Sequence, residues 1–170
     1  MKNDFVLPIL VLSLICLVIS SALAITNSFT EPVIADAATE RERVARYEML
    51  PEADSFESVS AQGLPATVRD VYRAINGAGY VFTISASGYG GDMVILCGIS
   101  PDGTLISSRA LNQAETKGIG SRVTEEPFAG QFIGMDSRLD GVVAISGATI
   151  SSNAYTGAIR DAFTAFDILT

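Results

Sequence analysis

A long run of apolar side chains opens the chain. From Phe5 to Ile25 no residue carries a charge. A helix of this length, at about 1.5 Å per residue, covers the roughly 30 Å hydrocarbon core of a bilayer. The remainder is long enough for one ordinary domain with a single core. The pattern therefore predicts a transmembrane anchor within residues 1–27 and one domain over residues 28–170.

The residues that flank the apolar run predict its orientation. Lys2 precedes the run, and the next basic residue is Arg41. Because positive charge beside a span favours the cytoplasmic side, we expect a single-pass protein of the cell membrane with a cytoplasmic N-terminus and an extracytoplasmic domain. A cleaved signal peptide is the alternative, since Ala22-Leu23-Ala24 has the form of a cleavage site. The apolar run is, however, longer than the about 7–15 residues usual in signal peptides.

Alternating patterns and turn-forming residues predict a sheet. Residues 28–51 mix apolar and charged side chains and predict a connecting helix, and residues 51–66 are typical of a loop. The composition of residues 51–66 is equally typical of an irregular sheet edge. Four β-rich runs then form two pairs, each joined by a turn-forming segment. The pairs are Val68–Ile75 with Tyr80–Ser85 around Asn76–Gly79, and Met93–Ile99 with Thr104–Ala110 around Pro101–Gly103. We expect a mainly antiparallel sheet of four or more strands.

The C-terminal part predicts flanking helical structure. Asn112 to Asp140 is a polar, glycine-bearing connection whose length is typical of functional loops. Val142–Ile145 predicts a short buried strand, and Ser151–Phe166 predicts a helix with one apolar stripe. The order of elements indicates an α+β domain.

Composition narrows the possible functions. The net charge of −8, from 19 acidic and 11 basic side chains, excludes a general nucleic-acid-binding surface. The chain has no histidine, which excludes Ser-His-Asp and Cys-His catalysis and imidazole metal sites. Cys16 lies in the apolar run, and Cys97 is best explained as a small buried apolar residue. Redox chemistry in this chain would therefore need an organic cofactor.

One segment combines glycine and hydroxyl residues ahead of the last predicted helix. It reads Ile145-Ser146-Gly147-Ala148-Thr149-Ile150-Ser151-Ser152. A glycine lets the backbone approach a ligand closely, and the free N–H groups at a helix start favour an anion such as phosphate. The simpler interpretation is that Ser146 or Ser151 caps the helix. The residues alone leave both interpretations open.

The same segment resembles a known flavin-attachment motif. SGATISS is similar to the motif of the FMN-binding domains in the RnfG and NqrC subunits, in which the last threonine of S/T-G-A-T carries FMN through a phosphoester bond. The segment Glu115–Gly120 is similar to the E-T-x-G-x-G segment of these domains, which lies by the flavin. The resemblance covers nearly the whole chain, and the short length favours the RnfG branch. It implies covalent FMN on Thr149 and a site formed by Ser146, Gly147, Ala148, Thr149, Ser151, Glu115, Thr116, Gly118 and Ile119.

The resemblance also implies a function. It implies an electron-transfer subunit of a membrane-bound, ion-translocating Rnf-type oxidoreductase, which couples electron flow between ferredoxin and NAD⁺ or a related acceptor to ion transport. The implied partners are other integral-membrane subunits and, during maturation, a flavin transferase that moves FMN from FAD onto Thr149 with Mg²⁺ and loss of AMP. The chain would relay electrons and would not catalyse the overall reaction alone.

Two positions depart from the family pattern, and two other functions stay open. Val143 stands where the family usually has Asp, and Lys117 stands where Pro is common. The first departure motivates a flavin-free structural or binding module of the same complex. A cleaved N-terminus would instead give a stand-alone extracytoplasmic flavoprotein. Tyr89 is a further candidate, either beside the flavin ring or packed in its own loop.

Overall fold

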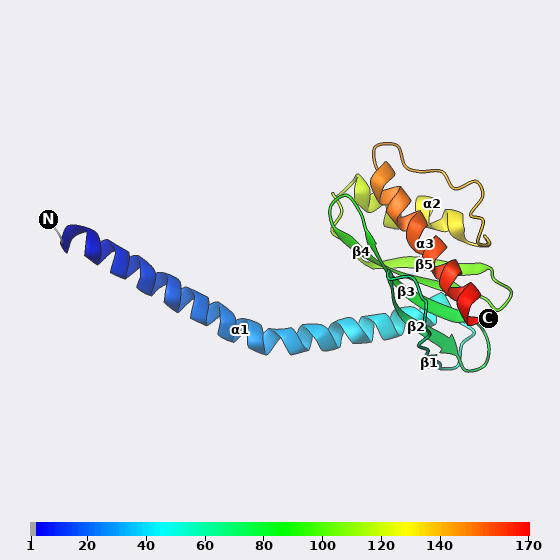
Figure 1. The fold of residues 1–170 in the computed structure, drawn as a ribbon, viewed down its shortest axis with the longest axis horizontal. Coiled ribbons are helices and arrows are strands. Elements are labelled where there is room, and N and C mark those ends of the chain that lie inside the picture. Colours follow the sequence, from blue (N-terminus) through cyan, green and yellow to red (C-terminus); the bar gives the residue numbers. More distant parts are fainter. Residues whose placement is uncertain (1–2) are drawn as a thin grey trace. The chain divides into compact units, whose positions relative to one another are not determined.

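The structure, a computed structural model, describes residues 3–170, with side chains from Val6 onward. Its contacts divide it into two compact units, the chain up to Arg41 and the unit Glu42–Thr170. Helix α1 (Asn3–Met49) contributes to both units (Figure 1).

The first unit is the part of α1 up to Arg41, which contains the apolar run. Its leucine, isoleucine and valine side chains are exposed all along the described helix. The helix is long and apolar enough to cross a membrane by its length and composition. The helix continues beyond the apolar run through Thr26 and Thr30, whose hydroxyls are satisfied by its own carbonyls: Thr26 Oγ1 donates to Ala22 O at 2.9 Å, and Thr30 Oγ1 donates to Thr26 O at 3.1 Å.

The second unit is built on a five-stranded antiparallel sheet in which every strand pairs with the next one along the chain. This arrangement confirms the predicted α+β class and the predicted antiparallel sheet, with the two predicted turns joining β2 to β3 and β4 to β5. The strands are β1 (Phe56–Ser58), β2 (Val68–Ala74), β3 (Tyr80–Ser87), β4 (Asp92–Ile99) and β5 (Leu105–Asn112).

Helices cover both faces of the sheet. On one face, helix α3 (Thr149–Leu169) packs its apolar stripe against β3 and β4, whose Phe82, Ile84 and Ile95 side chains are buried there. On the other face, the end of α1 buries its apolar side chains against Val81 and Leu96. The alternation along β3 and β4 thus supplies an apolar layer to both faces. The end of α1 is fixed further by Glu42, whose Oε1 accepts a 2.9 Å hydrogen bond from Thr83 Oγ1.

The contact between α1 and the sheet depends on a glycine in β4. A Cβ atom added at Gly98 would lie 2.6 Å from the backbone oxygen of Met49. We expect Gly98→Ala to lower the free energy of unfolding by about 1–3 kcal/mol, because the clash involves backbone that cannot rotate away. Gly157→Ala is the matched control. That helical site has open space, so it should stabilise the fold by about 0.5–1 kcal/mol. Urea unfolding followed by circular dichroism measures both changes, and a destabilisation equal in the two variants would contradict the close approach.

One sequence-based prediction is wrong, and it concerns a short element. Val142–Ile145 is not a strand, and Val143 is 69% exposed. Residues 51–66, predicted as a loop or an irregular edge, contain the short edge strand β1, which pairs with the C-terminal end of β2. The long connection after β5 contains three short helices: η1 (Gly120–Thr124), α2 (Glu126–Ala129) and η2 (Gly130–Phe132). These helices pack beside α3 (Figure 1).

Candidate functional site

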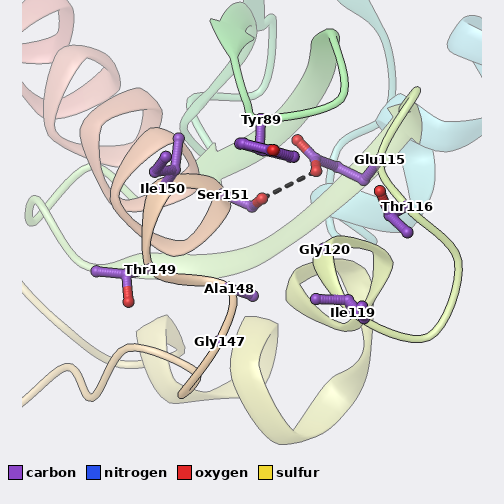
Figure 2. A pocket seen from close by; sticks show the side chains of 10 residues that line it. All are labelled: Tyr89, Glu115, Thr116, Ile119, Gly120, Gly147, Ala148, Thr149, Ile150 and Ser151. Carbon is purple, nitrogen blue, oxygen red and sulfur yellow. Dashed lines mark hydrogen bonds between the residues drawn. The ribbon is translucent and has the colours of Figure 1, made fainter.

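A cavity of about 430 Å³ lies at the start of α3. Three segments line it: the turn between β3 and β4, the loop that leads into η1, and the loop that leads into α3 (Figure 2). The lining residues are Tyr89, Glu115, Thr116, Ile119, Gly120, Gly147, Ala148, Thr149, Ile150 and Ser151. Its volume lies in the range of about 300–1,000 Å³ that is typical of ligand and cofactor pockets.

The N-terminus of α3 has no side-chain cap. Its N-cap residue is Ala148, and the first helical hydrogen bond runs from Ser152 N to Ala148 O at 2.9 Å. Within residues 3–170 no acceptor is recorded for the backbone N–H groups of Thr149, Ile150 and Ser151. The side chain of Thr149 is exposed beside them. A helix start with free N–H groups is a site that favours an anion.

The two serines after Thr149 have other partners, so the simple capping interpretation is wrong. Ser151 Oγ donates a 2.9 Å hydrogen bond to Glu115 Oε2, which ties the first turn of α3 to the facing loop (Figure 2). Ser152 Oγ accepts a 3.0 Å hydrogen bond from Ile145 N, which fixes the segment before the helix. Ser146 is exposed and makes no cap. Both buried serines therefore position the loop and leave the helix N–H groups free.

Gln131 holds the loop that carries the Ser-Gly-Ala-Thr segment. Its amide Oε1 accepts from Val143 N at 2.9 Å, and its Nε2 donates to Val143 O at 3.3 Å. The side-chain amide thus pairs with the backbone as a strand neighbour would. Downstream, Gly147 has a φ of +81°, a left-handed conformation that glycine adopts without strain. Together these contacts bring the chain to the start of α3.

Glu115 is the most constrained polar group at the cavity. Its residue is 8% exposed, and it is the only charged residue among the buried polar residues of the described chain. Its Oε2 atom accepts from Ser151 Oγ and, at 3.3 Å, from Gly90 N. Its Oε1 atom is buried and has no hydrogen-bond partner. A buried carboxyl oxygen without a partner is costly and therefore marks a functional candidate.

The structure brings together most of the residues that the sequence singled out. Thr149, Gly147, Ala148, Ser151, Glu115, Thr116 and Ile119 all line the cavity. Ser146 lines a neighbouring cavity of about 320 Å³ with Arg122 and Gln131. Gly118 lines neither of these cavities, and its N–H donates to Ser121 Oγ at 2.9 Å, so it shapes the loop.

Three further cavity residues extend the predicted set. Gly120 and Ile150 line the cavity but were not among the predicted site residues, although both lie inside the two motifs that carried the resemblance. Tyr89 also lines the cavity and is 74% exposed, so it is not packed inside its own loop. Taking every residue of the two motifs as a site residue would have identified Gly120 and Ile150.

No cysteine lines this cavity. Cys97 is buried between β4 and α3, and burial raises the pKa of its thiol, so the thiol stays protonated at neutral pH. No cluster of three His, Cys, Asp or Glu side chains that could hold a metal ion occurs among the described residues. The expectation that Cys97 is a small buried apolar residue is confirmed.

The described features fit the parts of FMN. The free N–H groups at the start of α3 suit the phosphate, and the exposed hydroxyl of Thr149 adjoins them. The side chains of Tyr89, Ile119 and Ile150 offer apolar surface to a ring system. Glu115 adds a carboxylate group to the wall of the same cavity.

Comparisons with known proteins define the class of protein to which this chain belongs. Residues 88–164, which include the cavity residues, match the FMN-binding domain family. This match supports FMN as the cofactor. The chain thus combines an apolar N-terminal helix with an FMN-binding domain.

Relatives of similar length define the family. The chain is 31% identical to the G subunit of the Na⁺-translocating ferredoxin:NAD⁺ oxidoreductase complex of Acetobacterium woodii, over 89% of this chain and 86% of the relative. It is 32% identical to the G subunit of the ion-translocating oxidoreductase complex of Methanosarcina acetivorans, over 91% and 90%. The solved structure of NqrC from Shewanella oneidensis has a TM-score of 0.48 and 17% identity, over 68% of this chain and 66% of that one. The chain belongs to the family formed by the G subunits of ion-translocating oxidoreductase complexes.

Proposed function

We propose that this chain is an electron-transfer subunit of a membrane-bound, ion-translocating oxidoreductase and that it carries FMN esterified to Thr149. The relatives named above are G subunits of such complexes, and residues 88–164 match an FMN-binding domain. The observation that carries the proposal is the exposed hydroxyl of Thr149 at an uncapped helix start beside a cavity. Acceptance and donation of electrons is the chemistry that FMN supplies when bound.

The residues of the chain have distinct roles in this proposal. Thr149 Oγ1 forms the ester bond to the phosphorus of FMN, and a flavin transferase breaks the pyrophosphate of FAD and releases AMP. The N–H groups of Ile150 and Ser151 stabilise the phosphate charge. Tyr89 and Ile119 limit the access of water to the ring. The chain needs no general base of its own, since its hydroxyl is only the acceptor in the transferase reaction.

The proposal also assigns a place in the membrane. Residues 1–27 form the anchor, and residues 28–170 form the extracytoplasmic domain, with residues 28–51 as the connecting helix. The anchor contacts other integral-membrane subunits of the complex. A covalent bond suits this location, because a flavin that dissociated outside the cell would be lost. The basic residue before the span and the absence of another before Arg41 support the orientation.

The intact mass of the full-length protein from its native host tests the proposal. We expect the mass of the chain that retains its N-terminal helix, increased by the mass of FMN less one water. An unmodified mass from flavin-sufficient cells would instead support the flavin-free module, for which Val143 at the usual Asp position is the reason. A flavinylated chain that begins near Ile25 would support the stand-alone flavoprotein.

A further inference from the structure

Glu115 joins all three segments that line the cavity. It belongs to the loop before η1, its Oε2 atom accepts from Ser151 Oγ on α3 at 2.9 Å, and the same atom accepts from Gly90 N in the β3–β4 turn at 3.3 Å. The backbone is also shaped around this carboxyl group. A Cβ atom at Gly88 would lie 1.8 Å from Oε1, and one at Gly120 would lie 2.2 Å from Oε2. Two glycines therefore leave the space that the carboxylate occupies.

The charge of Glu115 is not neutralised by a cation. Both recorded donors to the carboxylate are neutral, and none of the described ion pairs includes Glu115. The nearest basic residues along the chain, Lys117, Arg109 and Arg122, are exposed, so water and salt screen their effect on the cavity. Removing a carboxylate from water without a cation is expensive. The presence of this buried carboxylate at the wall of the cavity therefore indicates that its negative charge acts on the ligand that the cavity binds.

We propose that Glu115 sets the reduction potential of the bound flavin, by placing a buried negative charge beside it that makes the addition of electrons less favourable. The proposal rests on the proposed function, since it requires FMN in this cavity. Glu115 is a positioning residue, because its contacts also tie the β3–β4 turn to the first turn of α3. At an effective dielectric constant of about 20, a unit charge within about 10 Å of the flavin changes the equilibrium constant for the addition of one electron by more than about tenfold.

Redox titration of the flavinylated, detergent-solubilised full chain tests this inference. Glu115→Gln keeps the shape of the side chain and removes its carboxylate. We expect the midpoint potential to rise, with the equilibrium against a reference dye shifted more than about tenfold towards reduced flavin. Glu52→Gln is the matched control. Glu52 is exposed outside the cavity, so the same chemical change there should leave the potential within the error of the titration.

A second variant predicts a shift of opposite sign. Ser151→Ala removes one of the two neutral donors to the carboxylate, so its charge is less compensated and the midpoint potential should fall. If Glu115→Gln does not fold, the midpoint potential of Ser151→Ala tests the inference in its place. Three results would overturn the inference. The first is an unchanged midpoint potential in Glu115→Gln, and the second is a higher midpoint potential in Ser151→Ala. The third is a Glu115→Gln protein that folds but stays unflavinylated. Wild-type protein without flavin would instead overturn the proposed function, and the intact mass of the wild type separates the two failures.

Discussion

Thr149→Ala should abolish the covalent flavin completely. The variant lacks the only oxygen that the proposed ester uses. Of the three remaining hydroxyls of the motif, that of Ser146 lies at the neighbouring cavity, and the other two are engaged in hydrogen bonds. Ser151 Oγ is buried in its hydrogen bond to Glu115, and Ser152 Oγ is buried in its hydrogen bond with Ile145 N. Intact mass measures the loss of FMN less one water, and in-gel flavin fluorescence should disappear with it.

Two variants complete this test. Thr149→Ser retains a hydroxyl at the same position and should keep a flavinylated fraction. Thr164→Ala removes another threonine hydroxyl of α3, one that is exposed and bonds back to Arg160 O at 3.0 Å, and it should be fully modified. Because Thr149 is also exposed, its loss should not change the unfolding midpoint. Flavin retained at full mass in Thr149→Ala would show that the attachment residue has been assigned wrongly.

The sequence predicted those strands whose ends are defined by turn-forming residues. Asn76–Gly79 and Pro101–Gly103 each joined two β-rich runs, and the structure pairs those runs as expected. Prediction from the sequence was incomplete or wrong where an element depends on partners that lie far away along the chain. β1 is three residues long and pairs only with the end of β2, so its own residues carry little signal. The Val142–Ile145 run has apolar residues but no strand beside it, and its backbone pairs with the amide of Gln131.

The candidate site was predictable from motifs, and its internal contacts were not. The two motifs placed Thr149 and Glu115 in one site, and the fold does bring their segments to one cavity. Periodicity could not show that Ser151 donates to Glu115 instead of capping its own helix, because that choice depends on a loop 36 positions away. The orphaned Oε1 atom of Glu115 follows from the packing of two glycine-containing turns around it. Such contacts appear only once the segments are placed together.

An aromatic cluster of Phe128, Phe132 and Tyr155 packs between the short helices and α3. We expect Phe132 to make a large contribution to the free energy of unfolding. Phe132 in η2 is fully buried, and its ring stacks on that of Tyr155 in α3 with centroids 5.5 Å apart. Phe128 meets both rings edge-on, at 5.5 Å and 5.8 Å. Tyr155 extends the cluster to the sheet by donating to Ser108 Oγ at 3.0 Å. These rings therefore join the short helices, α3 and β5.

Phe132→Ala should lower the free energy of unfolding by about 3–5 kcal/mol, since it removes a buried ring and leaves a cavity. This is a large part of the about 5–15 kcal/mol that stabilises an ordinary domain. Urea unfolding of the full chain in detergent, followed by tyrosine fluorescence because the chain has no tryptophan, measures the change.

Ile133→Ala is the matched control for this prediction. Ile133 is the next residue along the chain but is 53% exposed, so truncation there removes little buried surface and should change the free energy of unfolding by about 0.5 kcal/mol or less. The segment before η2 supplies Ile119 and Gly120 to the cavity, and its attachment to α3 runs through these rings. The flavinylated fraction should therefore fall in Phe132→Ala and stay at the wild-type level in Ile133→Ala. Equal destabilisation by both variants would show that the short helices are held to α3 by contacts other than the aromatic cluster.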